Sequence, residues 1–272
     1  MSLSRTLHFI LNHPLNRGRP ISALVRFGKW QLQSRLQDEV LFAWIDDAKL
    51  IVRSGMTGAT GNIYCGLHEY ADMAFVMHLL REGDLFLDLG ANIGSYTVLA
   101  SRVCGARSIS VEPDPETFLS LQRNIEANGI GDRVELVETA LGATAGIARF
   151  SIGLDTTNRV LDDAFGSTRE VQLTSLDSIV GDRRPTMIKM DVEGYEGEVL
   201  KGARKTLKMD SLLAVETEAS DSEVIGALGD AGFERWYYDP VPRILSRQPC
   251  DLSASNALYI RDVENVRVRP ET

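Results

Sequence analysis

The stretch that decides the fold is Asp84-Leu-Phe-Leu-Asp-Leu-Gly-Ala-Asn-Ile-Gly-Ser-Tyr-Thr97. Its first half is mostly apolar, which is typical of a strand buried on both faces of a parallel sheet. Gly90 and Gly94 follow, and residues 95–103 then have the pattern of a helix. Glycines in such a turn let the backbone approach a ligand, and free amides at a helix start bind anionic groups. The stretch therefore predicts a strand, a ligand-binding turn and a helix.

The same alternation of strands and helices continues downstream. We predict further strands over residues 108–112, 134–138, 187–191 and 212–216, and helices over residues 115–128, 195–207 and 222–231. Residues 147–152 and 170–173 interrupt the pattern and suggest an inserted hairpin. Residues 233–238 and 257–260 are predicted as a final strand pair with no helix between them, which gives an antiparallel edge. This order indicates an α/β fold of the Rossmann-like type, with helices on both faces of the sheet.

The chain is expected to form one main domain. We assign residues 81–262 to this domain, residues 1–80 to an N-terminal extension and residues 263–272 to a polar tail. The extension mixes helical and extended pieces, with breakers at Pro14, Pro20 and residues 55–61. We expect part of it to cover the ligand cleft.

Composition and charge narrow the class of protein. The chain has 272 residues, of which 44% are hydrophobic and 25% charged, as in ordinary globular domains. Its net charge of −9 argues against a broad surface for nucleic-acid phosphates. A basic group of Arg17, Arg19, Arg26 and Lys29 is interpreted as a solvated helix face, with a membrane surface or an anionic substrate as alternatives.

Cysteine usage and hydropathy bear on the location of the protein. The three cysteines, Cys65, Cys104 and Cys250, are scattered and show neither metal-site spacing nor a paired arrangement. This pattern favours a reducing, cytoplasmic setting. No integral membrane segment is expected, because a span needs about 20 apolar residues and the opening apolar run is far shorter.

An adenosyl cofactor is suggested by the acidic residues that end the first two strands. Asp88 is placed to orient a cationic amino group, and Glu112 follows Gly90 at roughly the 20-residue interval typical of a carboxylate that binds ribose hydroxyls. Pro113 stiffens the turn after Glu112, and Asn128 or residues 138–141 are candidates to border the adenine. Asn92 stands where a dinucleotide fold has its second glycine, which favours S-adenosylmethionine over NAD.

A second acidic group lies at the end of the strand predicted over residues 187–191. Asp191 is a candidate proton acceptor for a substrate hydroxyl, or a ligand for a divalent ion such as Mg²⁺. Glu193 is either catalytic or a cap for the next helix, and Glu216 beside Asp191 would complete an acidic cluster. Because methyl transfer can be accelerated by orientation alone, the sequence does not choose between a base and a metal ligand.

The segment from Tyr64 to Glu69 precedes the first core strand and is expected to fold back over the cofactor cleft. Tyr64 and Glu69 are the candidate cofactor contacts there. His68 is a candidate base, although a hydrogen-bonded structural histidine is the more common role.

Together these motifs resemble the FkbM family of methyltransferases. The resemblance rests on GLHE, DLFLDLGANIGSYT, VEPDP, IKMDVEGYEGEVLKGA and NALYI, in that order. It implies an S-adenosylmethionine-dependent enzyme with a seven-stranded sheet whose last strand is antiparallel. It also implies O-methylation of a hydroxyl on a sugar, glycan or polyketide-like small molecule.

The family pattern assigns roles to matching positions. It implies Asp191 and Glu193 as the acidic motif and Glu69 as the upstream acidic residue, whereas His68 stands where a typical member has Tyr. Together with Glu216, the acidic motif forms our catalytic set. The cofactor set implied by the resemblance and by our own assignments is Tyr64, Glu69, Asp88, Gly90, Asn92, Ile93, Gly94, Tyr96, Thr97, Glu112, Pro113 and Asn128.

Two other functions remain open at this point. A non-catalytic module could bind S-adenosylmethionine as a scaffold within a glycan-assembly complex. An NAD-dependent oxidoreductase would need a partner for hydride transfer such as Tyr-x-x-x-Lys, but Tyr195 is followed four positions later by Val199. The sequence does not indicate the oligomeric state.

Overall fold

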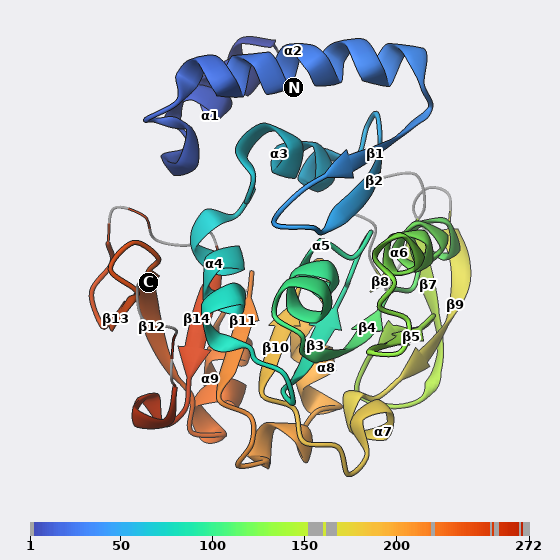
Figure 1. The fold of residues 1–272 in the computed structure, drawn as a ribbon. Helices are drawn as coiled ribbons and strands as arrows, with labels where there is room; N and C mark the ends of the chain where they lie inside the picture. The colour runs from blue at the N-terminus through green and yellow to red at the C-terminus, as the bar shows by residue number, and fades with distance from the viewer. Residues whose placement is uncertain are drawn as a thin grey trace.

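A central eight-stranded sheet organises the computed structural model, with helices on both of its faces (Figure 1). The structure describes residues 3–151, 160–161, 168–218, 221–250, 252, 256–266 and 268. Five parallel strands form most of the sheet: β3 (Leu85–Leu89), β4 (Arg107–Val111), β5 (Val134–Val137), β10 (Met187–Met190) and β11 (Ala214–Thr217). The order is β13-β12-β14-β11-β10-β3-β4-β5, so the predicted α/β fold is confirmed.

The C-terminal side of the sheet is antiparallel. Strand β14 (Ala257–Ile260) lies between β11 and β12 (Glu234–Asp239) and runs antiparallel to both. The predicted strand pair is therefore confirmed, but β14 is inside the sheet. The edge is an additional strand, β13 (Ile244–Ser246), which makes eight strands where seven were expected. It forms because the chain turns through Pro240 and Pro242 and returns along β12.

Two helical layers bury opposite sides of the strands. One face is covered by α4 (Tyr70–Leu79), α5 (Ser95–Val98), η2 (Leu99–Val103) and α6 (Pro115–Asn128), the other by α7 (Leu176–Val180), α8 (Glu196–Lys201) and α9 (Ser222–Asp230). Phe86 packs into the core beneath α4, whereas Leu87 and Leu89 pack into the core beneath α8 and α9. Successive side chains of a strand alternate between faces, so Asp88 points toward the α4 face with Phe86.

The helix predicted over residues 195–207 is shorter in the structure. It ends at Lys201, and the chain continues into a separate turn, η4 (Thr206–Lys208). The reason is local packing, because a Cβ at Gly202 would lie 2.2 Å from the carbonyl oxygen of Gly142. This contact requires a glycine where a helix former would otherwise stand.

The predicted inserted hairpin belongs to a second, four-stranded sheet. Its strands are β6 (Ala140–Leu141), β7 (Gly146–Ser151), β8 (Val160–Leu161) and β9 (Thr168–Thr174), in the order β6-β9-β7-β8. Strands β7 and β9 pair antiparallel, as the sequence predicts. Of the predicted tail, η5 (Val263–Asn265), Val266 and Val268 are described, and the rest lies outside the described residues.

The N-terminal residues form a layer on top of the sheet domain (Figure 1). It comprises α1 (Leu3–Asn12), η1 (Pro14–Asn16), α2 (Pro20–Leu36), β1 (Glu39–Ala43), β2 (Lys49–Arg53) and α3 (Thr57–Cys65). The prediction that residues 55–61 interrupt helical structure is wrong, since α3 begins at Thr57. A Cβ at Gly61 would lie 2.1 Å from Nδ1 of His68, so tertiary packing places a glycine inside this helix.

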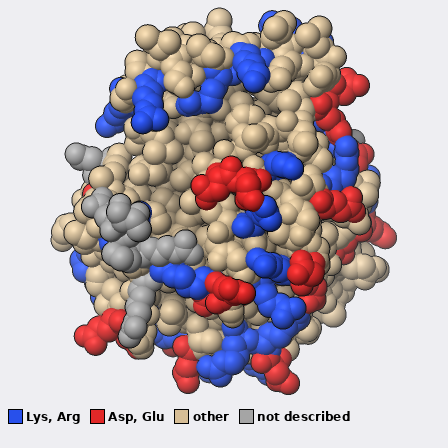
Figure 2. Space-filling model, in the orientation of Figure 1, with Lys and Arg blue, Asp and Glu red and all other residues tan. Residues whose placement is uncertain are grey.

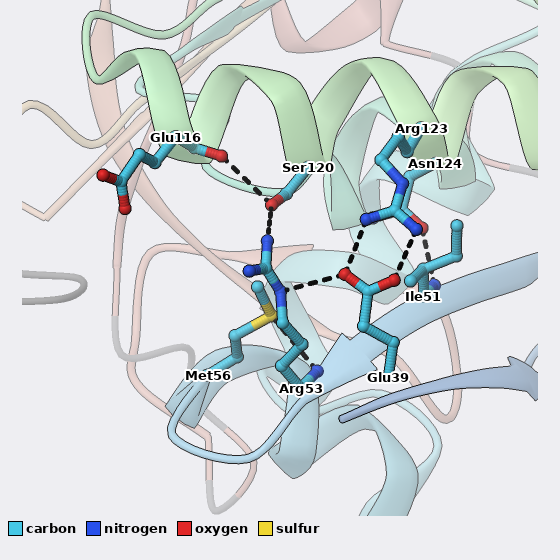
Figure 3. A network of polar contacts seen from close by, with 8 residues as sticks. All are labelled: Glu39, Ile51, Arg53, Met56, Glu116, Ser120, Arg123 and Asn124. Carbon is cyan, nitrogen blue, oxygen red and sulfur yellow. Dashed lines mark hydrogen bonds and ion pairs between the residues drawn. The ribbon is translucent and has the colours of Figure 1, made fainter. Parts of the chain in front are cut away.

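Polar contacts attach this layer to α6 (Figure 3). Glu39 of β1 accepts from Arg123 of α6 and also pairs with Arg53 of β2 at 3.3 Å. Arg53 donates to Ser120 Oγ at 2.7 Å, and the backbone N–H of Ile51 donates to a side-chain oxygen of α6. The hairpin β1–β2 is therefore held to the sheet domain by side chains from one face of α6.

Within the described part of the chain, no helix combines the length and apolar character that a membrane crossing requires.

Candidate functional site

A cleft of about 300 Å³ opens at the carboxyl ends of β3, β4 and β10, the edge where open α/β sheets bind ligands. Residues from all three motifs of the sheet domain meet there, although they are far apart in the sequence. The residues of the predicted set that line it are Glu69, Asp88, Gly90, Asn92, Ile93, Tyr96, Glu112, Pro113, Asp191 and Glu193.

The turn after β3 requires glycine for two separate reasons. Gly90 and Gly94 have φ values of 78° and 89°, in the region that disfavours side chains. A Cβ at Gly90 would also lie 1.9 Å from the carbonyl oxygen of Asp191, and one at Gly94 would lie 2.5 Å from Leu121 Cδ1. Asn92 adopts φ 52° and accepts from the N–H of Ile93 at 2.7 Å. The turn is thus wedged between β10 and α6.

Glu112 is a buried carboxylate held by two backbone amides. Its Oε2 accepts from the N–H of Asn92 at 2.9 Å and its Oε1 from the N–H of Asp114 at 2.9 Å. A carboxylate has about four acceptor positions, so each oxygen keeps a position for a further donor. Burial raises the pKa of Glu112 to about 7, and the two amide donors counteract this rise.

Asp88 is buried at the end of β3 and bonded within the domain. The Thr97 hydroxyl donates to its Oδ2 at 2.5 Å, and Thr97 Oγ1 lies 2.7 Å from Ser110 Oγ. Burial raises the pKa of Asp88 to about 6, while the Thr97 hydrogen bond and the charge of Lys189 lower it. Thr97 therefore orients Asp88 from behind and does not itself line the cleft.

A row of three ionisable side chains crosses the sheet beneath the cleft. The strand register places Lys189 of β10 directly between Asp88 of β3 and Glu216 of β11. All three are buried, and side chains opposite each other on one face interact. Carboxylates at Asp191, Glu216, Glu69 and Asp88 raise the pKa of Lys189 despite its burial, which keeps it charged.

The α4 side of this row carries further carboxylates. The Tyr96 hydroxyl donates to Glu69 Oε2 at 2.8 Å, and Asn256 Nδ2 donates to Asp72 Oδ2 at 3.0 Å. Burial and the nearby charge of Asp72 raise the pKa of Glu216 well above its ordinary value. Glu216 lies behind Lys189 and outside the cleft lining, so the structure gives this predicted catalytic residue a supporting position.

Three carboxylates lie together at the mouth of the cleft. Asp191, Glu193 and Glu218 each offer an oxygen within 4.8 Å of the others. Asp191 Oδ2 is 3.3 Å from Lys189 Nζ, whereas its Oδ1 is buried and has no hydrogen-bond partner among the described residues. Glu193 has a φ of 55° and does not occupy the N-cap of α8, which is Tyr195. Glu218 is not part of the catalytic set that was predicted from the sequence.

Some predicted cofactor residues do not line the cleft. The Tyr64 hydroxyl accepts from Gln31 Nε2 at 3.3 Å within the N-terminal layer. Asn128 exchanges two hydrogen bonds of 2.8 Å with the backbone of Lys49, which attaches β2 to α6. Residues 139–141 do line the cleft, at the alternative position proposed for the adenine border. Gly94 and Thr97 support the first turn from beneath.

Further residues line the cleft that were not predicted from the sequence. They come from α3 and from the start of α6: Met56, Gly58, Ala59, Asn62, Asp114 and Thr117. The residues on α3 could not be recognised because the glycines there were interpreted as breakers. Asp114 and Thr117 carry a signal, since Asp114 accepts from the Thr117 N–H at 3.0 Å as the N-cap of α6. His68 also lines the cleft, and burial lowers its pKa, which favours the neutral ring.

Comparison with known proteins finds a family and a curated relative. The model of the methyltransferase FkbM domain matches residues 88–234. The hexuronic acid methyltransferase AglP of Haloferax volcanii is 29% identical over 142 residues. That match covers 51% of this chain and 58% of the relative, so it spans little more than half of the relative's length.

Solved structures were also compared with the chain. A methyltransferase FkbM from Methylobacillus flagellatus has a TM-score of 0.45 at 17% identity, covering 88% of this chain and 60% of that one. A precorrin-6y C5,15-methyltransferase from Geobacter metallireducens has a TM-score of 0.42 at 13% identity, covering 71% of this chain and 87% of that one.

Proposed function

The chain belongs to the FkbM methyltransferase family, and we propose from this premise that it transfers a methyl group from S-adenosylmethionine to a hydroxyl of a glycan or a polyketide-like small molecule. The observation that carries the proposal is the meeting of the glycine turn, Glu112 and Asp191 in one cleft. The curated relative's name supports a sugar acid as the first acceptor to test.

The residues of the cleft fit the cofactor. The turn at Gly90 lines the cleft without a side chain, so the methionine moiety would approach the backbone closely there. Asp88 would accept from the amino group, and Glu112 from the ribose hydroxyls through the acceptor positions that its two amide bonds leave free. Residues 139–141 would border the adenine.

Bound S-adenosylmethionine supplies an electrophilic methyl group on a sulfonium. The chain has to orient the acceptor hydroxyl and receive its proton. Asp191 suits the second task because its side chain lines the cleft and is 39% exposed, while Lys189 Nζ lies 3.3 Å from its Oδ2 and fixes the carboxylate. Lys189 thus acts as a positioning residue for Asp191.

The cluster of three carboxylates at the cleft mouth also suits a divalent cation. Asp191, Glu193 and Glu218 provide oxygen ligands within 4.8 Å of one another, the donor type that Mg²⁺ prefers. A bound cation would hold the acceptor hydroxyl and lower its pKa. Activity with and without a chelator decides between this chemistry and a simple proton acceptor.

Calorimetric titration with S-adenosylmethionine, S-adenosylhomocysteine and NAD tests the cofactor. We expect both adenosyl compounds to bind and NAD not to bind. Preference for NAD would favour the oxidoreductase alternative. Cofactor binding without turnover on any hydroxylated glycan would favour the scaffold alternative, and no binding at all would contradict the proposal.

The Glu112→Ala variant is expected to weaken cofactor binding by about 1–3 kcal/mol, because it removes charge-assisted hydrogen bonds to the ribose. The measurement is the dissociation constant by calorimetry. Glu135→Ala is the matched control, since this exposed carboxylate lies on the neighbouring strand and outside the cleft. An unchanged affinity of Glu112→Ala would rule out the ribose role.

Cofactor affinity is expected to fall below neutral pH. The pKa of Glu112 is raised to about 7, and the ionised form is the one that accepts from two hydroxyls. Affinity should therefore drop by about tenfold from pH 8 to pH 6, as the ionised fraction does. Glu112→Gln should remove this dependence and leave the dependence due to Asp88, whose pKa is about 6. The folding stability of the cofactor-free protein changes with pH in the opposite direction. Because the pKa of Glu112 is higher in the folded state than in the unfolded chain, protonation of Glu112 stabilises the folded state at low pH. This contribution is lost as the pH rises toward 7.

A further inference from the structure

Helix α2 presents an aliphatic stripe to solvent. Its outward residues recur at helical spacing along one side, with large exposed fractions. They are Ile21 (78%), Leu24 (40%), Val25 (63%), Leu32 (61%) and Leu36 (75%). A surface helix normally turns such side chains toward the core. We call these five residues the outer stripe.

The opposite side of α2 is fixed by polar contacts, so the outer stripe cannot turn inward. Arg26 Nη2 donates to the carbonyl oxygen of Tyr64 at 2.9 Å and to Asn16 Oδ1 at 2.7 Å. Ala23 and Trp30 are buried on the same inward side. The orientation of the helix is therefore a built feature of the fold, and it leaves the apolar side chains outside.

The N-terminal layer is also basic in an acidic protein. Before Asp38 the sequence contains no Asp or Glu, although the whole chain has a net charge of −9. The cations of this segment are Arg5, Arg17, Arg19, Arg26, Lys29 and Arg35. Lys29 and Arg35 share the side of the outer stripe by helical spacing. Figure 2 shows Lys and Arg side chains along this layer at the top of the molecule.

We propose that α1 and α2 dock on the surface of an anionic lipid bilayer, with the outer stripe inserted at the boundary between headgroups and acyl chains. Exposed aliphatic side chains flanked by cations, in a segment that contains no carboxylate before Asp38, are the complement of such a surface. A symmetric contact with a second copy is disfavoured, because it would gather Lys29 and Arg35 of both copies at one interface, and residues 1–37 contain no carboxylate to neutralise them.

The docked orientation places the cleft close to the bilayer. Helix α2 packs on α3, and Met56, Gly58 and Ala59 at the start of α3 line the cleft. The cleft therefore lies about one helix layer, roughly 10 Å, from the docking surface. Docking needs neither cofactor nor methyl transfer, so its test is independent of the proposed function.

The experiment is co-sedimentation of the full chain with vesicles of phosphatidylcholine alone and of phosphatidylcholine mixed with phosphatidylglycerol. We expect binding to the anionic vesicles that weakens with salt, and at least about tenfold weaker binding to the neutral ones. The double variant Leu24→Gln/Leu32→Gln should bind the anionic vesicles about tenfold more weakly or worse. Lys29→Glu/Arg35→Glu should lose the preference for anionic lipid.

Matched controls change the same residue types elsewhere on the surface. Leu119→Gln/Ile225→Gln replaces exposed aliphatic residues of α6 and α9, and Arg184→Glu/Arg204→Glu replaces exposed cations; both should bind vesicles as the unaltered chain does. Circular dichroism and thermal melting verify that each variant is folded. Equal binding to both vesicle types, or unchanged binding by Leu24→Gln/Leu32→Gln, would overturn the proposal. So would a dimer in sedimentation velocity that this double variant converts to monomers.

Discussion

The Asp191→Asn variant is expected to lower turnover by about 10²- to 10⁴-fold, the contribution typical of a positioned proton acceptor. The amide keeps the shape of the side chain but cannot accept the hydroxyl proton. Cofactor affinity should change little, because the ribose and methionine contacts lie on other strand ends. Single-turnover rates and calorimetry with the same protein separate the two quantities. Full activity of this variant would exclude the catalytic assignment.

Two further measurements sharpen this result. Asp210→Asn, an exposed carboxylate outside the cleft, controls for the loss of a charge and should retain activity. Chelation of divalent ions in the unaltered enzyme should leave activity unchanged if Asp191 is a proton acceptor. Loss of activity on chelation and its return with Mg²⁺ would instead identify the carboxylates at the cleft mouth as ligands.

The Gly90→Ala variant is expected to destabilise the fold by about 3 kcal/mol and to abolish measurable cofactor binding. The added Cβ would lie 1.9 Å from the Asp191 carbonyl oxygen, a backbone atom that cannot move without displacing the end of β10. The positive φ adds strain of about 1 kcal/mol. Chemical denaturation measures the first effect and calorimetry the second.

Gly194→Ala provides the control for this prediction. Gly194 has a φ of 88°, but a Cβ there meets no atom within 4 Å. Both variants therefore carry the backbone strain of a positive φ, but only Gly90→Ala also clashes with Asp191. The difference between their losses in free energy of unfolding measures the cost of that clash. Equal destabilisation by both variants would show that backbone strain alone accounts for the effect.

Much of the fold and part of the cleft could be predicted because local pattern and tertiary structure agree. The buried strand before Gly90 is nearly continuously apolar, and Asp114 and Gly129 mark the two ends of α6. Strand ends of a parallel sheet meet at one edge, so Asp88, Glu112 and Asp191 were expected together. The resemblance to the FkbM family is confirmed by the match to its model.

The remainder depended on contacts that no local pattern encodes. Helix α3 was missed because Gly61 was interpreted as a helix breaker, whereas its lack of a side chain makes room for His68, a contact that no local pattern encodes. Asn128 was assigned to the cofactor, but its amide pairs with the backbone of Lys49, a contact that depends on how the N-terminal layer docks. Glu216 was assigned to the catalytic set, yet it is buried behind Lys189, whereas Glu218 lines the cleft.

The buried row of Asp88, Lys189 and Glu216 also constrains how such sequences can diverge. One lysine stands between two carboxylates on adjacent strands, so a neutral residue at position 189 would leave two buried acids without their shared cation. Removal of one partner of a buried charged group is far more costly than joint replacement of all partners by apolar residues. The three positions are therefore expected to change together during evolution, as a single inherited unit that spans three strands.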